Sequence, residues 1–255
     1  PLGLFRNPAF ALTGAVAFCV GAAMFAAILF IPLVLQLVQD RSATASGLML
    51  TAMTTGLLIS SVGVGRAVSR TGRHKAPPVA GTVLITVAML ALTRLDPATS
   101  AAYTVTALTL LGLGIGLVSP VLVAVAQSSV DVRDLGIATA SVSFFRNLGG
   151  TVGSAVGVAV LTHRLNDAAL DVDQVSTLPE QVDALPAAAQ EAYALAFAEA
   201  ATGVFWVAAA VGAVAVVLAA LTPALTLSQV AAEEPGDQYV PGTSTSAAAP
   251  TSPAS

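Results

Sequence analysis

Long stretches without a charged residue dominate the hydrophobic pattern of this chain. Asp, Glu, Lys and Arg are absent from residues 7–39, 42–65, 76–93, 97–130 and 200–232, and Leu135 to Leu161 contains only Arg146. An α-helix rises about 1.5 Å per residue, so ~20 apolar residues cross the ~30 Å hydrocarbon core of a bilayer. The pattern therefore predicts six membrane-spanning helices, near residues 10–37, 45–68, 76–95, 101–125, 137–161 and 200–221.

The apolar runs are continuous and lack the alternation of a barrel strand. Helices and closed barrels are the structures that satisfy every backbone N–H and C=O in lipid, so we expect an all-α integral membrane fold. Composition agrees, because 56% of residues are hydrophobic and 9% are charged, against about 25% charged in soluble domains. The net charge of -4 leaves no basic surface for nucleic acid, which excludes that class of partner.

Few residue types capable of catalysis or metal binding lie at membrane depth. The single cysteine, Cys19, excludes an intrachain disulfide and is interpreted as a small buried hydrophobe. No Ser/His, paired Asp or His/Glu constellation occurs within the spans. We therefore assign no catalytic residue, no metal site and no enzymatic activity.

The distribution of Lys and Arg predicts the orientation of the spans. One side would hold Arg6, Arg66, Arg70, Arg73, Lys75, Arg133 and Arg146, and the other Arg41, Arg94 and Arg164. The richer side should be cytoplasmic, which places both termini there. The first three spans would then begin inside and the second three outside, as two inverted three-helix repeats.

Two segments fall outside this helical pattern. Residues 162–199 carry seven scattered acidic residues and should form an outward-facing loop whose Ala-rich second part extends the sixth helix. Residues 225–255 are rich in Ser, Thr, Pro, Ala and Gly and predict a disordered cytoplasmic tail, so the transmembrane bundle would occupy residues 1–224. The chain begins with Pro1, and we expect it to be a piece of a longer protein.

The loop between the second and third spans has the most specific motif. Residues 65–75 read GRAVSRTGRHK, and they resemble the major facilitator superfamily signature G-x-x-x-D-R-x-G-R-x-K. The match comprises Gly65, Arg70, Gly72, Arg73 and Lys75, whereas Ser69 stands where the family has an acid. In that family the motif is implicated in closing the cytoplasmic side. A serine can cap a helix but cannot form the ion pair, which weakens the gate that the resemblance implies.

Further strings extend the resemblance over residues 1–224. They are Leu4 to Asn7, Leu35-Gln36, Ser42 to Gly47 and Phe145 to Gly150. In order and spacing they look like the C-terminal six helices of bacterial fourteen-helix drug:proton antiporters. The resemblance implies an N-terminal helical half as partner, transport by alternating access, and location in the plasma membrane.

The fifth span contains two features of its own. Gly149, Gly153 and Gly157 recur every four residues and share one helix face, where close helix packing is favoured over a hinge. Arg146 would lie about 6 Å inside the span. It is equally well interpreted as an anchor reaching the interface or as a charge with a partner. That partner would be a carboxylate or helix end of the missing half, or Asp131 or Asp134.

The spans offer few polar side chains for a substrate cavity. The candidate wall residues are Met24, Phe25, Phe30, Gln36, Ser119 and Gln127. Helix packing or lipid contact explains any single aromatic or Met residue better, and a place at the membrane interface is the alternative for Gln36 and Gln127. No Asp or Glu lies inside a span, so a coupling proton would be carried by the missing half, without a cofactor in this chain.

Three functions remain open from the sequence. The first is proton-coupled efflux of small hydrophobic compounds such as drugs or antibiotics. The second is transport of a polar metabolite, which would need more polar side chains along the spans. The third is a six-helix membrane scaffold that moves no substrate.

Overall fold

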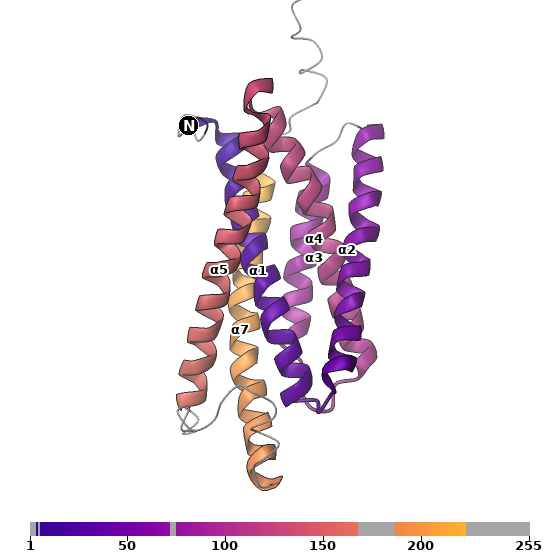
Figure 1. Cartoon of the computed structure of the whole chain (residues 1–255), viewed down its shortest axis with the longest axis vertical. Helices are drawn as coiled ribbons and strands as arrows, with labels where there is room; N and C mark the ends of the chain where they lie inside the picture. The colour runs from indigo at the N-terminus through magenta and orange to yellow at the C-terminus, as the bar shows by residue number, and fades with distance from the viewer. Residues whose placement is uncertain (1–3, 5, 72–74, 168–186, 223–255) are drawn as a thin grey trace, which may run out of the picture.

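The computed structural model is a bundle of long α-helices (Figure 1). It describes residue 4 and residues 6–71, 75–167 and 187–222. The helices are α1 (Pro8–Leu37), α2 (Ala43–Thr71), α3 (Ala76–Leu92), α4 (Ala101–Ser128), α5 (Leu135–Asp167) and α7 (Ala187–Leu221), and a short 3-10 turn, η2 (Val132–Asp134), precedes α5. These ranges contain no β-strand, and the predicted all-α membrane fold is confirmed.

Among the described residues, five helices are long and apolar enough to cross a membrane, and α3 is shorter. It has 17 residues and ends three residues before the predicted limit at Leu95. The chain continues beyond it in tighter turns, because the Arg94 N–H donates to the Ala91 carbonyl at 3.1 Å and the Leu95 N–H to the Leu92 carbonyl at 3.3 Å. The apolar segment therefore still approaches the length of a crossing.

The predicted outward loop is shorter than expected at both ends. Helix α5 continues to Asp167 and α7 begins at Ala187, so the Ala-rich stretch does extend the sixth helix. Residues 168–186, like the predicted tail at 225–255, lie outside the described residues.

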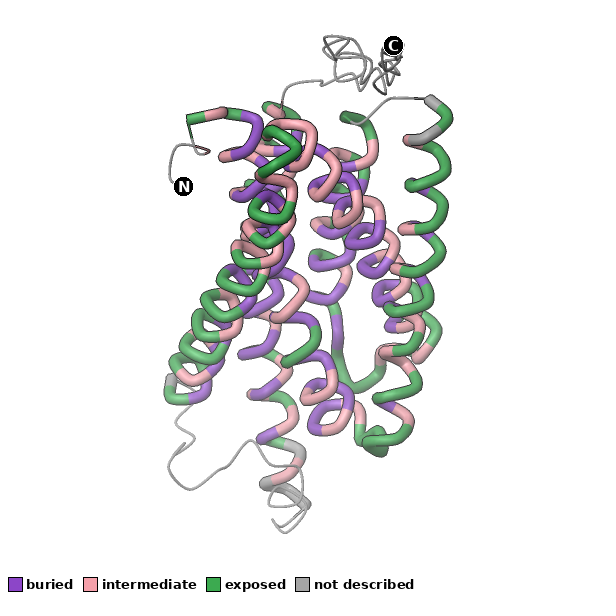
Figure 2. The backbone as a smooth tube through the Cα atoms, turned by 45° about the horizontal axis from the view of Figure 1, so that its top comes forward, coloured by how far each residue is buried: buried purple, intermediate pink, exposed green. Residues whose placement is uncertain are grey.

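Helices α1 and α4 form the centre of the bundle. Helix α1 packs against α5 and α7, α4 packs against α2 and α3, and α3 packs against α7. In the most apolar 18-residue window, 61% of α1 and 56% of α4 are buried, against 22% for both α2 and the segment containing α5. Figure 2 shows the same contrast, with buried residues along the central helices and exposed ones on α2 and α5.

The packing repeats itself between the two halves of the chain. Helices α1, α2 and α3 of the first half correspond in order to α4, α5 and α7 of the second half. The contact of α1 with α5 then corresponds to the contact of α4 with α2, and the contact of α1 with α7 to that of α4 with α3. The second helix of each three-helix unit thus packs on the first helix of the other unit. Two inverted three-helix repeats account for this exchange, as predicted from the topology.

Glycines bring the backbones together in both of these crossed pairs. A Cβ added to Gly149 would meet the Phe18 carbonyl, one added to Gly21 would meet the Arg146 carbonyl, and one added to Gly153 would lie 2.6 Å from the Ala22 Cα. We call this contact the α1/α5 glycine seam. Small residues at a helix interface allow close van der Waals packing in lipid, where no hydrophobic force drives helices together.

The equivalent α4/α2 glycine seam has the same construction. A Cβ on Gly112 would meet the Met53 carbonyl, one on Gly116 would meet the Leu57 carbonyl, and one on Gly56 would lie 2.7 Å from the Thr109 carbonyl oxygen. Each central helix is therefore held to its outer helix by main-chain contact.

At each end of the bundle a hydrogen bond connects two chain segments that are distant in sequence. Asn7 Oδ1 accepts from the Ala9 N–H at 3.0 Å and caps α1, while Asn7 Nδ2 donates to the Ser129 carbonyl at 3.1 Å after α4. At the opposite end Gln39 Nε2 donates to the Asp96 carbonyl at 3.3 Å. The reversal between α1 and α2 passes through Asp40, whose φ of 49° is a left-handed conformation that Asp adopts more readily than most residues.

We predict that Gly112→Ala and Gly149→Ala each destabilise the full-length protein, because the added methyl group must push one backbone away from another. Overpacking of this kind costs about 1–3 kcal/mol. Gly63→Ala is the matched control, since a Cβ there meets nothing within 4 Å and Ala favours the helix. The thermal midpoint of the purified protein in detergent measures the effect, and equal midpoints for Gly112→Ala and Gly63→Ala would contradict it.

We predict a graded response at Asn7. Asn7→Asp keeps the capping oxygen but loses the donor to Ser129, whereas Asn7→Ala loses both, and a lost cap alone costs about 0.5–2 kcal/mol. Thermal midpoints should fall in the order wild type, Asn7→Asp, Asn7→Ala. An Asp variant no more stable than the Ala variant would show that the cap contributes nothing.

Candidate functional site

Part of the predicted cavity wall lies on the exposed side of α1. Phe25, Leu29 and Gln36 are spaced by four and seven residues and share one face of the helix. Leu29 is 42% exposed, whereas Phe25, Gln36 and the nearby Met24 are half-buried. This face is apolar except at Gln36, which lies at the end of α1 remote from Asn7.

The two predicted phenylalanines lie over glycines of α5. A Cβ on Gly150 would be 2.5 Å from the Phe25 ring, and one on Gly157 would be 2.9 Å from Phe30 Cζ. Phe25 remains half-buried on the face of α1. Phe30 is only 1% exposed and belongs to the hydrophobic core, so it packs helices together and lines no open surface.

The predicted polar wall residues make different contacts. Gln36 Nε2 donates to the Pro32 carbonyl at 3.1 Å within α1. Gln127 Nε2 donates to Thr139 Oγ1 at 2.9 Å and so connects the end of α4 to the beginning of α5. Ser119 follows Gly112 and Gly116 by seven and three residues, which places it on the side of α4 that faces α2. These three groups do not converge on one point.

A polar stripe on α5 is the feature that the prediction of individual wall residues missed. Ser143, Asn147, Gly150 and Ser154 are spaced by four, three and four residues and share one face with Arg146. We call Ser143, Arg146, Asn147 and Ser154 the polar flank of α5. The 3.6-residue period of these polar residues was present in the sequence and could have revealed it.

The contacts of α5 show which way its polar flank turns. On this side Gly150 is covered by Phe25 of α1 and Thr139 reaches Gln127 of α4. The other exposed side carries Phe144, Leu148 and Val152, which are 61%, 40% and 42% exposed. The polar flank therefore borders the α1 and α4 side of the bundle, and the apolar side turns away from it.

Arg146 stands out on this flank by its lack of partners. Its side chain is half-buried, and within the described ranges it makes no hydrogen bond or ion pair. The predicted partners Asp131 and Asp134 lie before α5, and neither forms a salt bridge with it there. No Asp or Glu occurs in α1, α2, α3 or α4.

An apolar cavity lies on the opposite side of the α1/α5 glycine seam. It has a volume of about 90 Å³ and is lined by α1, α5 and α7, with Val152, Val156 and Val207 among its walls. Gly153 and Gly157 also line it, so missing side chains contribute to the space. Its lining residues are all apolar and offer no group that could orient a polar ligand.

The predicted gating loop is described only in part. Gly65 and Arg70 lie exposed near the end of α2, Ser69 is in its last turn, and Lys75 immediately precedes α3. Gly72 and Arg73 lie outside the described residues. The loop thus connects α2 to α3 at the end of the bundle where α1 begins (Figure 1).

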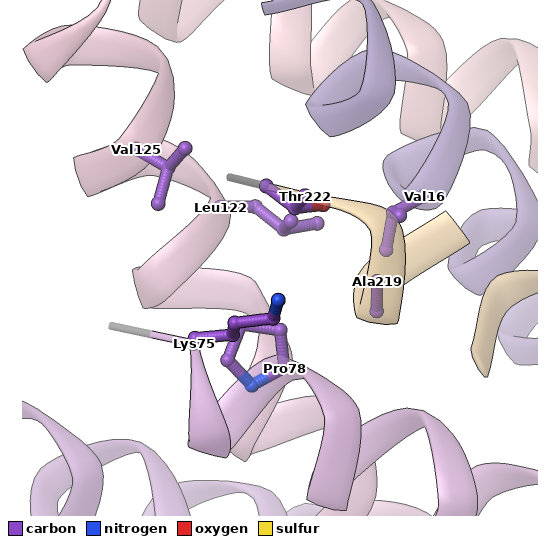
Figure 3. Close-up of a pocket in the computed structure, with 7 residues that line it drawn as sticks. All are labelled: Val16, Lys75, Pro78, Leu122, Val125, Ala219 and Thr222. Carbon is purple, nitrogen blue, oxygen red and sulfur yellow. The ribbon is translucent and has the colours of Figure 1, made fainter. Parts of the chain in front are cut away.

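Lys75 reaches the end of another helix. Figure 3 shows its Nζ pointing into a small cavity that is also lined by Leu122 of α4 and by Ala219 and Thr222 at the end of α7. The cavity measures about 10 Å³, roughly the space of one water molecule. The carbonyl end of a helix carries partial negative charge, so an ammonium group near the end of α7 is favourably placed.

The described part of the chain offers no cluster of His, Cys, Asp and Glu that could hold a metal ion. The arrangement is instead that of a membrane-embedded bundle with one apolar central helix face, one polar flank and a cationic loop at one end.

Comparison with known proteins agrees with the fold. The sequence model of the Major Facilitator Superfamily matches residues 2–154 of this chain. An uncharacterized MFS-type transporter of Mycobacterium tuberculosis is 39% identical over 249 residues, which cover 94% of this chain and 36% of that protein. The multidrug transporter protein MdtP of Bacillus subtilis is 33% identical over 73% of this chain and 35% of its own length.

A third relative is a tetracycline resistance determinant of Streptomyces rimosus, 33% identical over 63% of this chain and 46% of its own length. The chain thus spans between a third and a half of each of these relatives. The family match covers more than half of the chain and agrees with its multi-pass helical bundle. This protein belongs to the Major Facilitator Superfamily.

Proposed function

We propose that this chain is the C-terminal bundle of a proton-coupled efflux transporter for hydrophobic drugs or antibiotics. The observation that carries the proposal is the similarity to proteins named as a multidrug transporter and as a tetracycline resistance determinant, each 33% identical. Alternating access between this bundle and an N-terminal helical half would move the substrate. The whole transporter would have twelve or fourteen helices.

The α1 face supports a hydrophobic substrate. Ile28 and Leu29 are 44% and 42% exposed, and Met24 and Phe25 lie beside them. Polarizable and aromatic side chains adapt to apolar solutes of different shape. Gln36 and Gln127 would supply the few polar contacts. Ser119 and Phe30 would pack behind the residues that line the cavity. A polar metabolite would need more hydrogen-bonding groups than this face presents.

The proton would be handled outside this chain. Glu191 and Glu199 of α7 precede an uncharged stretch from Ala200 to Leu221, whose 22 residues span about 33 Å, so both positions fall at the membrane edge or beyond. A titrating group inside the hydrocarbon region is the usual proton carrier of a transporter. We therefore assign this role to a carboxylate of the N-terminal half.

The loop at residues 65–75 would close the cytoplasmic side. Its described cations Arg66, Arg70 and Lys75 lie at the same end of the bundle as Arg6 and Arg133. The positive-inside rule favours a plasma membrane orientation in which this end and both termini are cytoplasmic. Lys75 would hold the beginning of α3 to the end of α7. Gly65, Ser69, Arg70, Gly72 and Arg73 would complete the gate without the ion pair of the family motif.

We predict that the full-length protein in everted membrane vesicles releases protons from the vesicle lumen when a lipophilic cation or tetracycline is added. Exchange of an external substrate against internal protons dissipates an acid-inside gradient, which a pH-sensitive dye reports. Replacing an intramembrane carboxylate of the N-terminal half by its amide should abolish the response. Glu199→Gln should leave it intact.

Two controls and one contradiction define this test. Vesicles without the protein and vesicles with a collapsed pH gradient should give no signal. A flat response to cationic and neutral lipophilic compounds, with correctly inserted protein, would reject drug efflux. It would favour a metabolite transporter if polar solutes respond, and a scaffold if no solute does.

A further inference from the structure

The polar flank of α5 reaches too deep into the membrane to be explained by contact with the interface. Helix α5 has 33 residues and is about 50 Å long, so a centred ~30 Å core leaves about 10 Å of helix at each end. Arg146 lies about 17 Å from Leu135 along the axis, or about 7 Å inside the core. An arginine at this depth can still extend to the interface.

Its neighbours cannot do so. Asn147 lies one residue deeper and has a short side chain, and Ser154 lies about 12 Å beyond Arg146 along the helix. Ser154 Oγ donates to the Thr151 carbonyl at 3.0 Å, which satisfies it within the helix. The exposed Asn147 amide makes no hydrogen bond among the described residues. An unpaired amide facing hydrocarbon costs several kcal/mol by transfer measurements, so this flank faces protein or water.

The position of α5 is fixed at this level of the helix. The Arg146 carbonyl is in contact with Gly21, and Gly149 with the Phe18 carbonyl. The α1/α5 glycine seam therefore presents the guanidinium and the Asn147 amide at a defined place. Both groups are donors at neutral pH, and within the described helices no acidic side chain accompanies them.

We propose that Arg146, assisted by Asn147, binds a carboxylate side chain on a helix of the N-terminal half and thereby positions α5 against that half. A guanidinium and a carboxylate form paired, charge-assisted hydrogen bonds, and the Asn147 amide can donate to an oxygen that remains. None of the described helices α1 to α4 contains an Asp or Glu, and the chain spans 36% of its relative from M. tuberculosis, so we place the partner in the N-terminal half. The inference goes beyond drug efflux and holds for any transported solute.

The first test measures transport by the full-length protein. Arg146→Gln should lower the maximal rate by about tenfold or more for cationic and neutral compounds alike, because the partner charge is left unpaired at depth. Arg146→Lys keeps the charge and should retain most of the rate. Arg133→Gln removes an exposed charge from the same end of the bundle and should transport as wild type.

The outcomes separate this proposal from others. Wild-type rates in Arg146→Gln would overturn it. A rise in KM for anionic compounds alone would also overturn it, since Arg146 would then bind the substrate.

A second test does not depend on transport. In a full-length Cys19→Ala background, Asn147→Cys should cross-link to a cysteine placed at one intramembrane Asp or Glu position of the N-terminal half. Arg146→Glu combined with arginine at that position should restore the thermal midpoint that either change alone lowers. No cross-link at any such position would overturn the proposal, even if the protein exports no drug.

Discussion

Main-chain contact between helices is the constraint on which the rest of this bundle depends. At Gly21 and Gly149 in one pair, and at Gly112 and Gly56 in the other, the absence of a Cβ lets a neighbouring carbonyl approach the helix directly. In lipid, where apolar side chains gain little by association, such close packing supplies much of the attraction between helices. Every feature of the candidate site is positioned relative to these two contacts.

The two repeats share this frame but differ in what they present. Helix α5 combines Arg146 and Asn147 on one flank with Phe144 and Leu148 on the other. The corresponding helix, α2, has exposed Leu58, Ile59 and Val62 at 59%, 64% and 50%. Thr51 Oγ1 donates to the Leu48 carbonyl at 2.6 Å and Thr55 Oγ1 to the Thr51 carbonyl at 2.8 Å, both within α2. A common backbone arrangement thus carries a polar flank on α5 and an exposed apolar surface at Leu58 to Val62 of α2.

The helices could be predicted from the sequence, because each crossing of the hydrocarbon core needs about 20 apolar residues with every backbone group hydrogen-bonded. Charge-free runs of this length are directly visible in the sequence. The spacing of Gly149, Gly153 and Gly157 indicated a shared face. It could not show that the face meets α1, because partner choice depends on contacts more than a hundred residues apart. Phe30 illustrates the same limit. The sequence does not distinguish a buried phenylalanine from an exposed one, and only the structure shows that Phe30 is buried against Gly157. The polar flank of α5 could have been found from the sequence alone, because its polar residues recur with the period of an α-helix.

The crossed packing of the repeats also bears on biosynthesis. Helix α1 leaves the ribosome more than a hundred residues before α5, and α2 precedes α4 by about two helices, so neither three-helix unit can complete its own packing. Until the later helices enter the bilayer, the Gly21 surface of α1 must remain covered by lipid or by a helper protein. A nascent chain halted after α3 would therefore expose an unfinished surface to quality control.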